Sequence, residues 1–168
     1  MMGSGKTTVG RLLASRTRWQ FYDNDTLLAL LREGATPRTV LAQSGVEGLR
    51  AAEADALRLG LSRPAPCIVA APAGAILEGK MREALKTQAL VIWLDAGPKT
   101  LARRARGAPH RPWLEGDAET WMRSNLAERA PLYKSVADLI VWTQRRRPAA
   151  AATQILDWLA DRVECAIP

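Results

Sequence analysis

Short apolar runs alternate along the chain with longer segments in which apolar residues recur at the spacing of a helix. The apolar runs predict four buried strands, at 20–23, 67–71, 90–94 and 139–143. The amphipathic segments predict six helices, at 6–15, 46–61, 78–85, 99–105, 119–130 and 149–163. Strands that alternate with helices are typical of βα units stacked around a parallel sheet, so the pattern predicts a three-layer α/β fold with a short parallel sheet.

Capping and helix-breaking residues agree with these bounds. Thr26 and Thr36 are suited to helix caps, Pro98 to a first helical turn, and Gly34 and Gly45 to helix ends. The segment 106–116 has no periodicity and is rich in glycine and proline, which predicts a mobile loop.

Composition narrows the possible classes of protein. At 168 residues, 48% hydrophobic and 24% charged, the chain matches a single globular domain over 1–168. No apolar stretch is long enough to cross a bilayer and no secretory signal is present, so we expect a cytoplasmic protein that does not bind membranes. Two cysteines, Cys67 and Cys165, and one histidine, His110, cannot build a disulfide framework or a cysteine-histidine metal centre.

The formal net charge of +7 indicates a surface that favours anionic partners. The sequence does not interleave basic residues with stacking aromatics and has no evident reading helix, as nucleic-acid binding would require. We therefore expect phosphate and carboxylate ligands of small molecules rather than nucleic acid.

A phosphate-binding motif opens the chain. The run Gly3-Ser4-Gly5-Lys6-Thr7-Thr8 matches the second half of the pattern G-x-x-x-x-G-K-[ST]. In that pattern backbone N–H groups surround the β-phosphate, the lysine reaches the β and γ oxygens, and the hydroxyl after it binds Mg²⁺. The alternative is a glycine-rich tail before an amphipathic helix, but the run leads directly into the apolar face of 9–13, as nucleotide binding requires.

The motif is incomplete at its start. Its first glycine would fall one position before Met1, and no residues precede it to form the strand that feeds such a loop. We expect this first strand to be missing from the chain, with neighbouring backbone groups left unpaired, and a start set too late in the reading frame as the cause. The alternative is a shortened protein with a weakened nucleotide site.

Together with this loop, the chain from Met2 to about Leu159 resembles shikimate kinase, a member of the nucleoside-monophosphate-kinase-like P-loop superfamily. The segments that carry the resemblance are 23–25, like the family's D-x-D; 45–53, like G-E-x-x-F-R-x-x-E; 111–114, like R-P-x-L; and 129–133, like R-x-P-L-Y. Two places depart from the family: Leu49 replaces an aromatic ring beside the substrate, and Pro72-Ala73-Gly74 replaces a run of three glycines.

The resemblance implies a role for each matching residue. Those assigned to ATP are Gly3, Ser4, Gly5, Lys6, Thr7, Thr8, Arg104, Arg111 and Arg146. Those assigned to the substrate are Asp25, Arg50, Gly74 and Arg129, and Thr7 and Asp23 are assigned to Mg²⁺. Lys6, Asp25 and Arg111 are the implied catalytic residues, with Arg111 carried by a lid at about 106–118. Glu53 is expected to hold Arg50 in place.

The resemblance thus implies a monomeric kinase that uses ATP and Mg²⁺ to phosphorylate a hydroxyl of a small carboxylated alcohol, with shikimate as the first choice. Two alternatives stay open at this point. One is the ligand-sensing domain of a regulator of aromatic catabolism that binds an acyl-CoA, which the altered 72–74 loop would suit. The other is a kinase for another sugar acid, such as gluconate.

Overall fold

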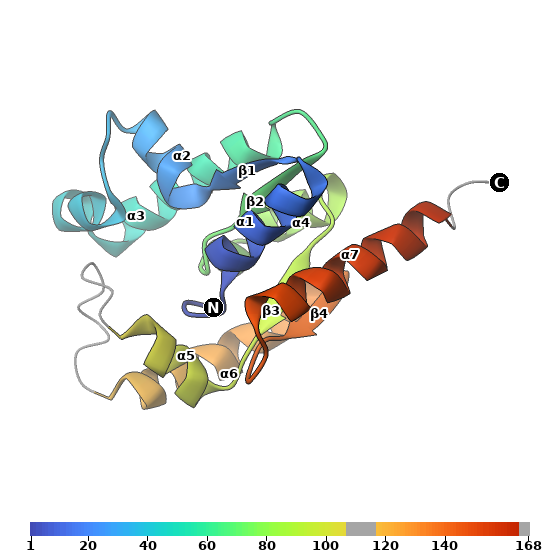
Figure 1. Cartoon of the computed structure of the whole chain (residues 1–168). Helices are drawn as coiled ribbons and strands as arrows, with labels where there is room; N and C mark the ends of the chain where they lie inside the picture. The colour runs from blue at the N-terminus through green and yellow to red at the C-terminus, as the bar shows by residue number, and fades with distance from the viewer. Residues whose placement is uncertain (107–116, 165–168) are drawn as a thin grey trace.

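The computed structural model describes residues 1–106 and 117–164. The elements are α1 (Lys6–Thr17), β1 (Gln20–Asp23), α2 (Asn24–Leu31), α3 (Pro37–Leu61), β2 (Cys67–Ala70), the 3₁₀ helix η1 (Ala75–Leu77), α4 (Gly79–Gln88), β3 (Ile92–Asp95), α5 (Pro98–Ala105), α6 (Ala118–Val136), β4 (Leu139–Trp142) and α7 (Pro148–Glu164) (Figure 1). The predicted α/β class is confirmed, and the four strands begin and end within two residues of their predicted bounds.

The strands form two parallel pairs. β1 lies beside β2, with Gln20 opposite Cys67, and β3 lies beside β4, with Ile92 opposite Leu139. Across 1–106 and 117–164, no ladder of hydrogen bonds joins one pair to the other, so the expected short sheet takes the form of two short parallel sheets. Parallel pairing needs a long crossover, which α2 and α3 supply for the first pair and α5 and α6 for the second.

Helices α1 and α7 form one outer layer. They pack against each other, α1 also lies against β1 and β2, and α7 lies against β4 (Figure 1). Val9, Leu13 and Ile155 form one apolar cluster with Leu94 and Val141. All five side chains are buried. Burial of this size contributes roughly 1.5–3 kcal/mol per large apolar side chain, an amount that ties the first helix to the last.

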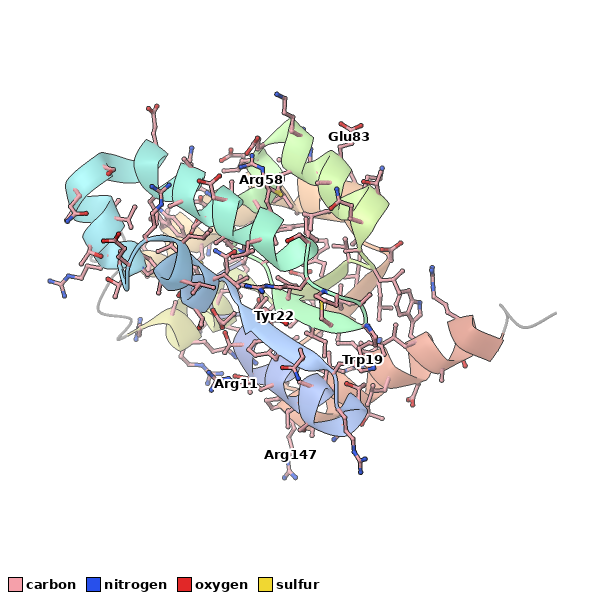
Figure 2. The ribbon with its side chains drawn as sticks, turned by 90° about the horizontal axis from the view of Figure 1, so that it is seen from above. Arg11, Trp19, Tyr22, Arg58, Glu83 and Arg147 are labelled. Atoms are coloured by element: carbon pink, nitrogen blue, oxygen red, sulfur yellow. The ribbon has the colours of Figure 1, made fainter. Side chains whose placement is uncertain are left out.

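The opposite layer is built from α3, α4, α5 and α6. Its main cluster includes Leu57, Met81, Leu101 and Met122, one from each helix, and none of these is more than 1% exposed. Figure 2 shows the two layers from above: Arg58 of α3 and Glu83 of α4 lie on one side of the strands, whereas Arg11 of α1 and Arg147 lie on the other. The predicted three-layer arrangement is confirmed.

Two α-helical segments were not predicted, and neither was the 3₁₀ helix η1. α2 follows β1 without a loop, because Asp23 caps it: its Oδ1 accepts the Asp25 N–H at 3.1 Å. The predicted cap at Thr26 is wrong, since Thr26 lies inside α2. The other segment, 37–44, begins at the predicted cap Thr36 and is joined to the expected helix through Gly45, whose φ of 65° and ψ of −169° kink α3.

Candidate active site

The phosphate-binding loop leads directly into α1. Gly3 and Gly5 have φ angles of 69° and 98°, in the left-handed region that glycine tolerates best. A side chain on Gly3 would place its Cβ 2.7 Å from the carbonyl oxygen of Leu101, so this position has no room for one. Gly5 is the N-cap of α1 and brings no side chain to the first turn, whose N–H groups can therefore bind an anion.

Lys6 and Ser4 lie within this loop as the motif predicts. The Lys6 ammonium Nζ donates to the carbonyl oxygen of Met1 at 3.0 Å, which holds the lysine alongside the loop. Ser4 is 1% exposed and its Oγ has no hydrogen-bond partner in the part of the chain that the structure describes. Thr8 is exposed in the first turn of α1.

The two residues assigned to Mg²⁺ are in contact. The Thr7 hydroxyl donates to Asp23 Oδ2 at 2.8 Å, which links the start of α1 to the end of β1. The other carboxylate oxygen of Asp23 caps α2, and this bond places Asp25 in the first, exposed turn of that helix. A hydroxyl beside a carboxylate fits Mg²⁺, which binds through few protein ligands and keeps several waters.

Arg104 connects α5 to the phosphate-binding loop and to the end of β4. Its Nη2 donates to the carbonyl oxygen of Thr143 at 2.9 Å, and its Nη1 lies 3.2 Å from Thr143 Oγ1 and 3.4 Å from the carbonyl oxygen of Gly3. The Thr143 hydroxyl in turn lies 3.0 Å and 3.3 Å from the carbonyl oxygens of Asp95 and Ser4, which share its single proton as acceptors. Thr143 therefore links the phosphate-binding loop to α5 and to the end of β3.

Sequence reasoning did not single out Thr143. Its signal was its position, a buried hydroxyl directly after a strand in a parallel sheet, where such folds bind ligands. Arg146 lies at the same turn: its N–H contacts the Thr143 carbonyl oxygen at 3.4 Å and its Nη1 donates to Gln154 Oε1 at 2.7 Å. The structure thus brings Arg104 and Arg146, two of the residues assigned to ATP, to one turn.

Asp95 ends β3 beside this network. Burial raises the pKa of its carboxyl group, and the Ala96 N–H and the positive amino terminus lower it in part. Its Oδ1 is buried without a hydrogen-bond partner among the described residues.

A cavity of about 370 Å³ lies between α3 and the loop that follows β2. It is lined by Arg50, Ala51, Glu53, Ala54, Pro72, Gly74, Ala75, Leu77 and Glu78. Arg50 and Gly74, both assigned to the substrate, are thus brought together. Lys6, Asp25 and Arg129 are not among the lining residues.

Leu49 does not line the cavity either, although the family pattern places a ring beside the substrate at this position. It is 8% exposed and packs with Leu28, Val40 and Ala56 between α2 and α3. Helix packing therefore explains why this position is apolar. Leu49, which replaces the family's aromatic residue, fills the core between α2 and α3 rather than the cavity.

Arg129 lies on α6, and its position is tied to the loop after β2 through Tyr133, one helical turn further on. The Tyr133 hydroxyl donates to the carbonyl oxygen of Ala73 at 2.7 Å. Burial raises the pKa of Tyr133 to about 12, while the charge of Arg129 and a hydrogen bond from it act in the opposite direction. The Arg129 Nε is buried and has no partner within the described residues.

Arg111 and most of the predicted lid at about 106–118 lie outside the residues that the structure describes.

None of the helices within 1–106 and 117–164 combines the length and apolar character needed to cross a membrane.

Comparison with known proteins agrees with this geometry. The family model described as shikimate kinase matches residues 2–160. The shikimate kinase of Symbiobacterium thermophilum is 39% identical over 167 residues, which cover 98% of this chain and 95% of that protein. Among solved structures, shikimate kinase from Acinetobacter baumannii in complex with shikimate has a TM-score of 0.89 and 32% identity, covering 96% of this chain and 89% of that one. Shikimate kinase from Bacteroides thetaiotaomicron has a TM-score of 0.82 at 25% identity, covering 95% and 94%.

Proposed function

Because the chain belongs to the shikimate kinase family, we propose that it transfers the γ-phosphoryl group of ATP to a hydroxyl of shikimate, a step of aromatic amino acid biosynthesis. The observation that carries this proposal is the hydrogen bond from Thr7 to Asp23. It brings the phosphate-binding loop next to the turn that holds Asp25, so the phosphoryl donor and the acceptor hydroxyl would meet at one place.

At the donor end, the loop glycines and the first turn of α1 bind the phosphates through their N–H groups. Lys6, which donates to the Met1 carbonyl oxygen in this structure, would donate to the β and γ oxygens of bound ATP instead. Thr7 and Asp23 hold Mg²⁺, which when bound neutralises the charge that develops on the transferred group.

At the acceptor end, Asp25 binds the hydroxyl that attacks the γ-phosphorus and receives its proton. Arg50 and Arg129 bind the carboxylate from two different helices, because a guanidinium group can donate two parallel hydrogen bonds to a carboxylate. Gly74 lets the backbone approach the ring of the acceptor. The protein then contributes positioning and charge rather than covalent chemistry.

Three further parts belong to the same proposal. Arg104 and Arg146 flank the adenine, and Arg111 closes over the phosphates from a lid at about 106–118 in a single domain. The enzyme acts as a cytoplasmic monomer on a small-molecule substrate. Sedimentation velocity at micromolar concentration tests the oligomeric state.

Replacing Lys6 with Met tests the donor site, because methionine keeps the length of the side chain and removes its charge. We expect turnover to fall by about 10³-fold, in the range found when one group that stabilises the transition state is lost. Shikimate binding, followed by tryptophan fluorescence, should change less than about twofold, a shift of under about 0.5 kcal/mol. Lys86→Met, an exposed lysine on α4, is the matched control. Normal turnover by Lys6→Met would refute the assignment.

The acceptor is tested by ADP release from the wild-type protein with a panel of hydroxy acids. We expect turnover with shikimate and little with gluconate. Turnover with gluconate but not with shikimate would mean that gluconate, rather than shikimate, is the acceptor. Binding of an acyl-CoA, without ADP release on any acid, would favour a sensor domain instead.

A further inference from the structure

The loop at 72–74 is held by its carbonyl groups. The Pro72 and Gly74 carbonyl oxygens accept the N–H groups of Ala75 and Leu77, at 3.2 and 3.0 Å, within the local turn that starts η1. The Ala73 carbonyl oxygen accepts instead from the Tyr133 hydroxyl at 2.7 Å, a partner 60 residues away on α6. This middle carbonyl therefore ties the loop to the rest of the protein.

Tyr133 is itself fixed from a third element. It is 8% exposed, and its ring stacks on Trp93 of β3 with the centroids 5.4 Å apart and an angle of 24° between the planes. A stacked and buried ring has few alternative rotamers, so the hydroxyl keeps a fixed position. A distance of 2.7 Å is the usual length of a good O–H···O bond.

The same tyrosine lies one turn after Arg129. Residues four apart on a helix are neighbours on one face, and the positive charge of Arg129 acts to lower the pKa of Tyr133, which agrees with that placement. The Tyr133 hydroxyl thus lies between the wall of the cavity formed by Pro72 and Gly74 and the guanidinium group of Arg129.

We propose that Tyr133 is a positioning residue that sets the distance between the 72–74 wall of the acid-binding cavity and Arg129. This inference rests on the proposed function, because it assigns to one hydroxyl the alignment of the two sides that receive the acceptor. Tyr133 does not contact the reacting atoms. It acts through the Ala73 carbonyl oxygen on one side and the Arg129 side chain on the other.

Loss of the hydroxyl has a defined consequence. The Ala73 carbonyl oxygen would be left in a partly buried place without its partner, and such a group costs free energy unless it moves to water. Movement of Ala73 displaces its neighbours Pro72 and Gly74, which line the cavity. Arg129, one helical turn before Tyr133, loses a polar neighbour at the same time. Shikimate affinity should therefore fall. The affinity for ATP should not change, because the nucleotide site is formed around Thr7 and Thr143 rather than around Ala73.

The test compares the two tyrosines of the chain, Tyr133 and Tyr22. For Tyr133→Phe we expect the KM for shikimate to rise about tenfold, while the KM for ATP stays within about twofold. Tyr22→Phe removes a hydroxyl from a half-buried ring on β1 and should change neither value. Equal changes in both KM values for Tyr133→Phe, or none, would overturn the inference.

The outcomes separate this inference from the proposed function. A wild-type protein inactive with ATP and shikimate counts against the function itself, whereas an active wild type with an unaltered Tyr133→Phe variant counts against the positioning role alone.

Should Tyr133→Phe not fold, the wild-type protein labelled with 3-fluorotyrosine provides a second measurement. Its two fluorine resonances are assigned with Tyr22→Phe. We expect shikimate to shift the Tyr133 resonance and ADP to leave it in place. A Tyr133 resonance whose chemical shift does not change when shikimate is added would contradict the proposal.

Discussion

The two ends of the candidate active site are organised differently. At the nucleotide end, Arg104 and the Thr143 hydroxyl already donate to backbone carbonyl groups of the loop and its neighbours, at 2.9 to 3.4 Å. At the acid end, Arg50 is exposed and the buried Nε of Arg129 has no partner among the described residues. At the nucleotide end the side-chain donors are thus used in hydrogen bonds within the protein. At the acid end, guanidinium donors are available to a ligand.

This difference follows from the chemistry of the two ligands. Triphosphate is bound mainly by backbone N–H groups, so the backbone must be held in shape before ATP arrives, and side chains do that work here. A carboxylate is bound by guanidinium groups themselves, and these are useful only while their donors are available. Substitutions at the two ends should therefore separate, with one set acting on the KM for ATP and the other on the KM for shikimate.

Among the substitutions expected to change the KM for only one of the two substrates, the largest effect is expected for Arg129→Lys. Lysine keeps the positive charge but not the planar fork, and its ammonium cannot replace both hydrogen bonds to a carboxylate. The loss of about 2–3 kcal/mol corresponds to a KM for shikimate roughly 30- to 150-fold higher, with the KM for ATP unchanged. Steady-state kinetics with each substrate varied in turn measures both values.

Arg123→Lys is the matched control, since Arg123 lies on the same helix and forms an exposed ion pair with Glu119 at 2.9 Å. Such pairs contribute little, so this variant should stay within about twofold of the wild type. A KM for ATP that rises together with that for shikimate in Arg129→Lys would show that the two ends are not separate.

Thr143→Val should produce a smaller effect at the opposite end. Valine has the same shape but neither donates to the Ser4 and Asp95 carbonyl groups nor accepts from Arg104. We expect the KM for ATP to rise about fivefold to tenfold, corresponding to about 1–1.4 kcal/mol, and the KM for shikimate to stay unchanged. Thr143→Ser restores the hydroxyl and should return the KM for ATP to near the wild-type value; failure of that rescue would mean that the methyl group, not the hydroxyl, is what matters.

Much of the nucleotide end was predictable from sequence because its requirements are local. Glycines that can adopt the left-handed backbone conformation, followed by a lysine and a threonine in one short run, specify a loop and the helix that follows it. The resemblance assigned Thr7 and Asp23 to the same Mg²⁺, and the structure places the two side chains in contact at the end of β1, although that contact itself was not predicted. By contrast, Thr143 is 139 residues from Ser4, and a single threonine after a strand carries no pattern that reveals such a bond.

The acid end was less predictable for the same physical reason. Arg50 and Gly74 come from distant segments, and only packing brings them to one cavity. The packing of Leu49 between α2 and α3 could not be predicted, because α2 itself was not predicted and its cap, Asp23, was assigned only to Mg²⁺.

The smallest effect is expected for Asp95→Asn. This substitution tests whether the buried carboxyl group beside the hydrogen bonds of Thr143 lowers the free energy of unfolding. Burial raises the pKa of the Asp95 carboxyl group in the folded protein above its ordinary value of 3.8, so the folded state favours the protonated form. The contribution of this group to stability is therefore complete below the unfolded pKa and is lost as the pH rises through the folded pKa. Asparagine cannot ionise, and at about pH 7 we expect the variant to be more stable than the wild type by less than about 1 kcal/mol.

That gain should disappear at about pH 3.5, where the wild-type carboxyl group is largely protonated. Urea unfolding at the two pH values measures the difference, with Asp157→Asn, an exposed carboxylate on α7, as the control expected to stay within about 0.5 kcal/mol. An Asp95→Asn variant less stable than the wild type at neutral pH would mean that the ionised carboxylate is held by the Ala96 N–H and the amino terminus more strongly than burial disfavours it. The nucleotide end would then be stabilised, rather than strained, by its buried charge.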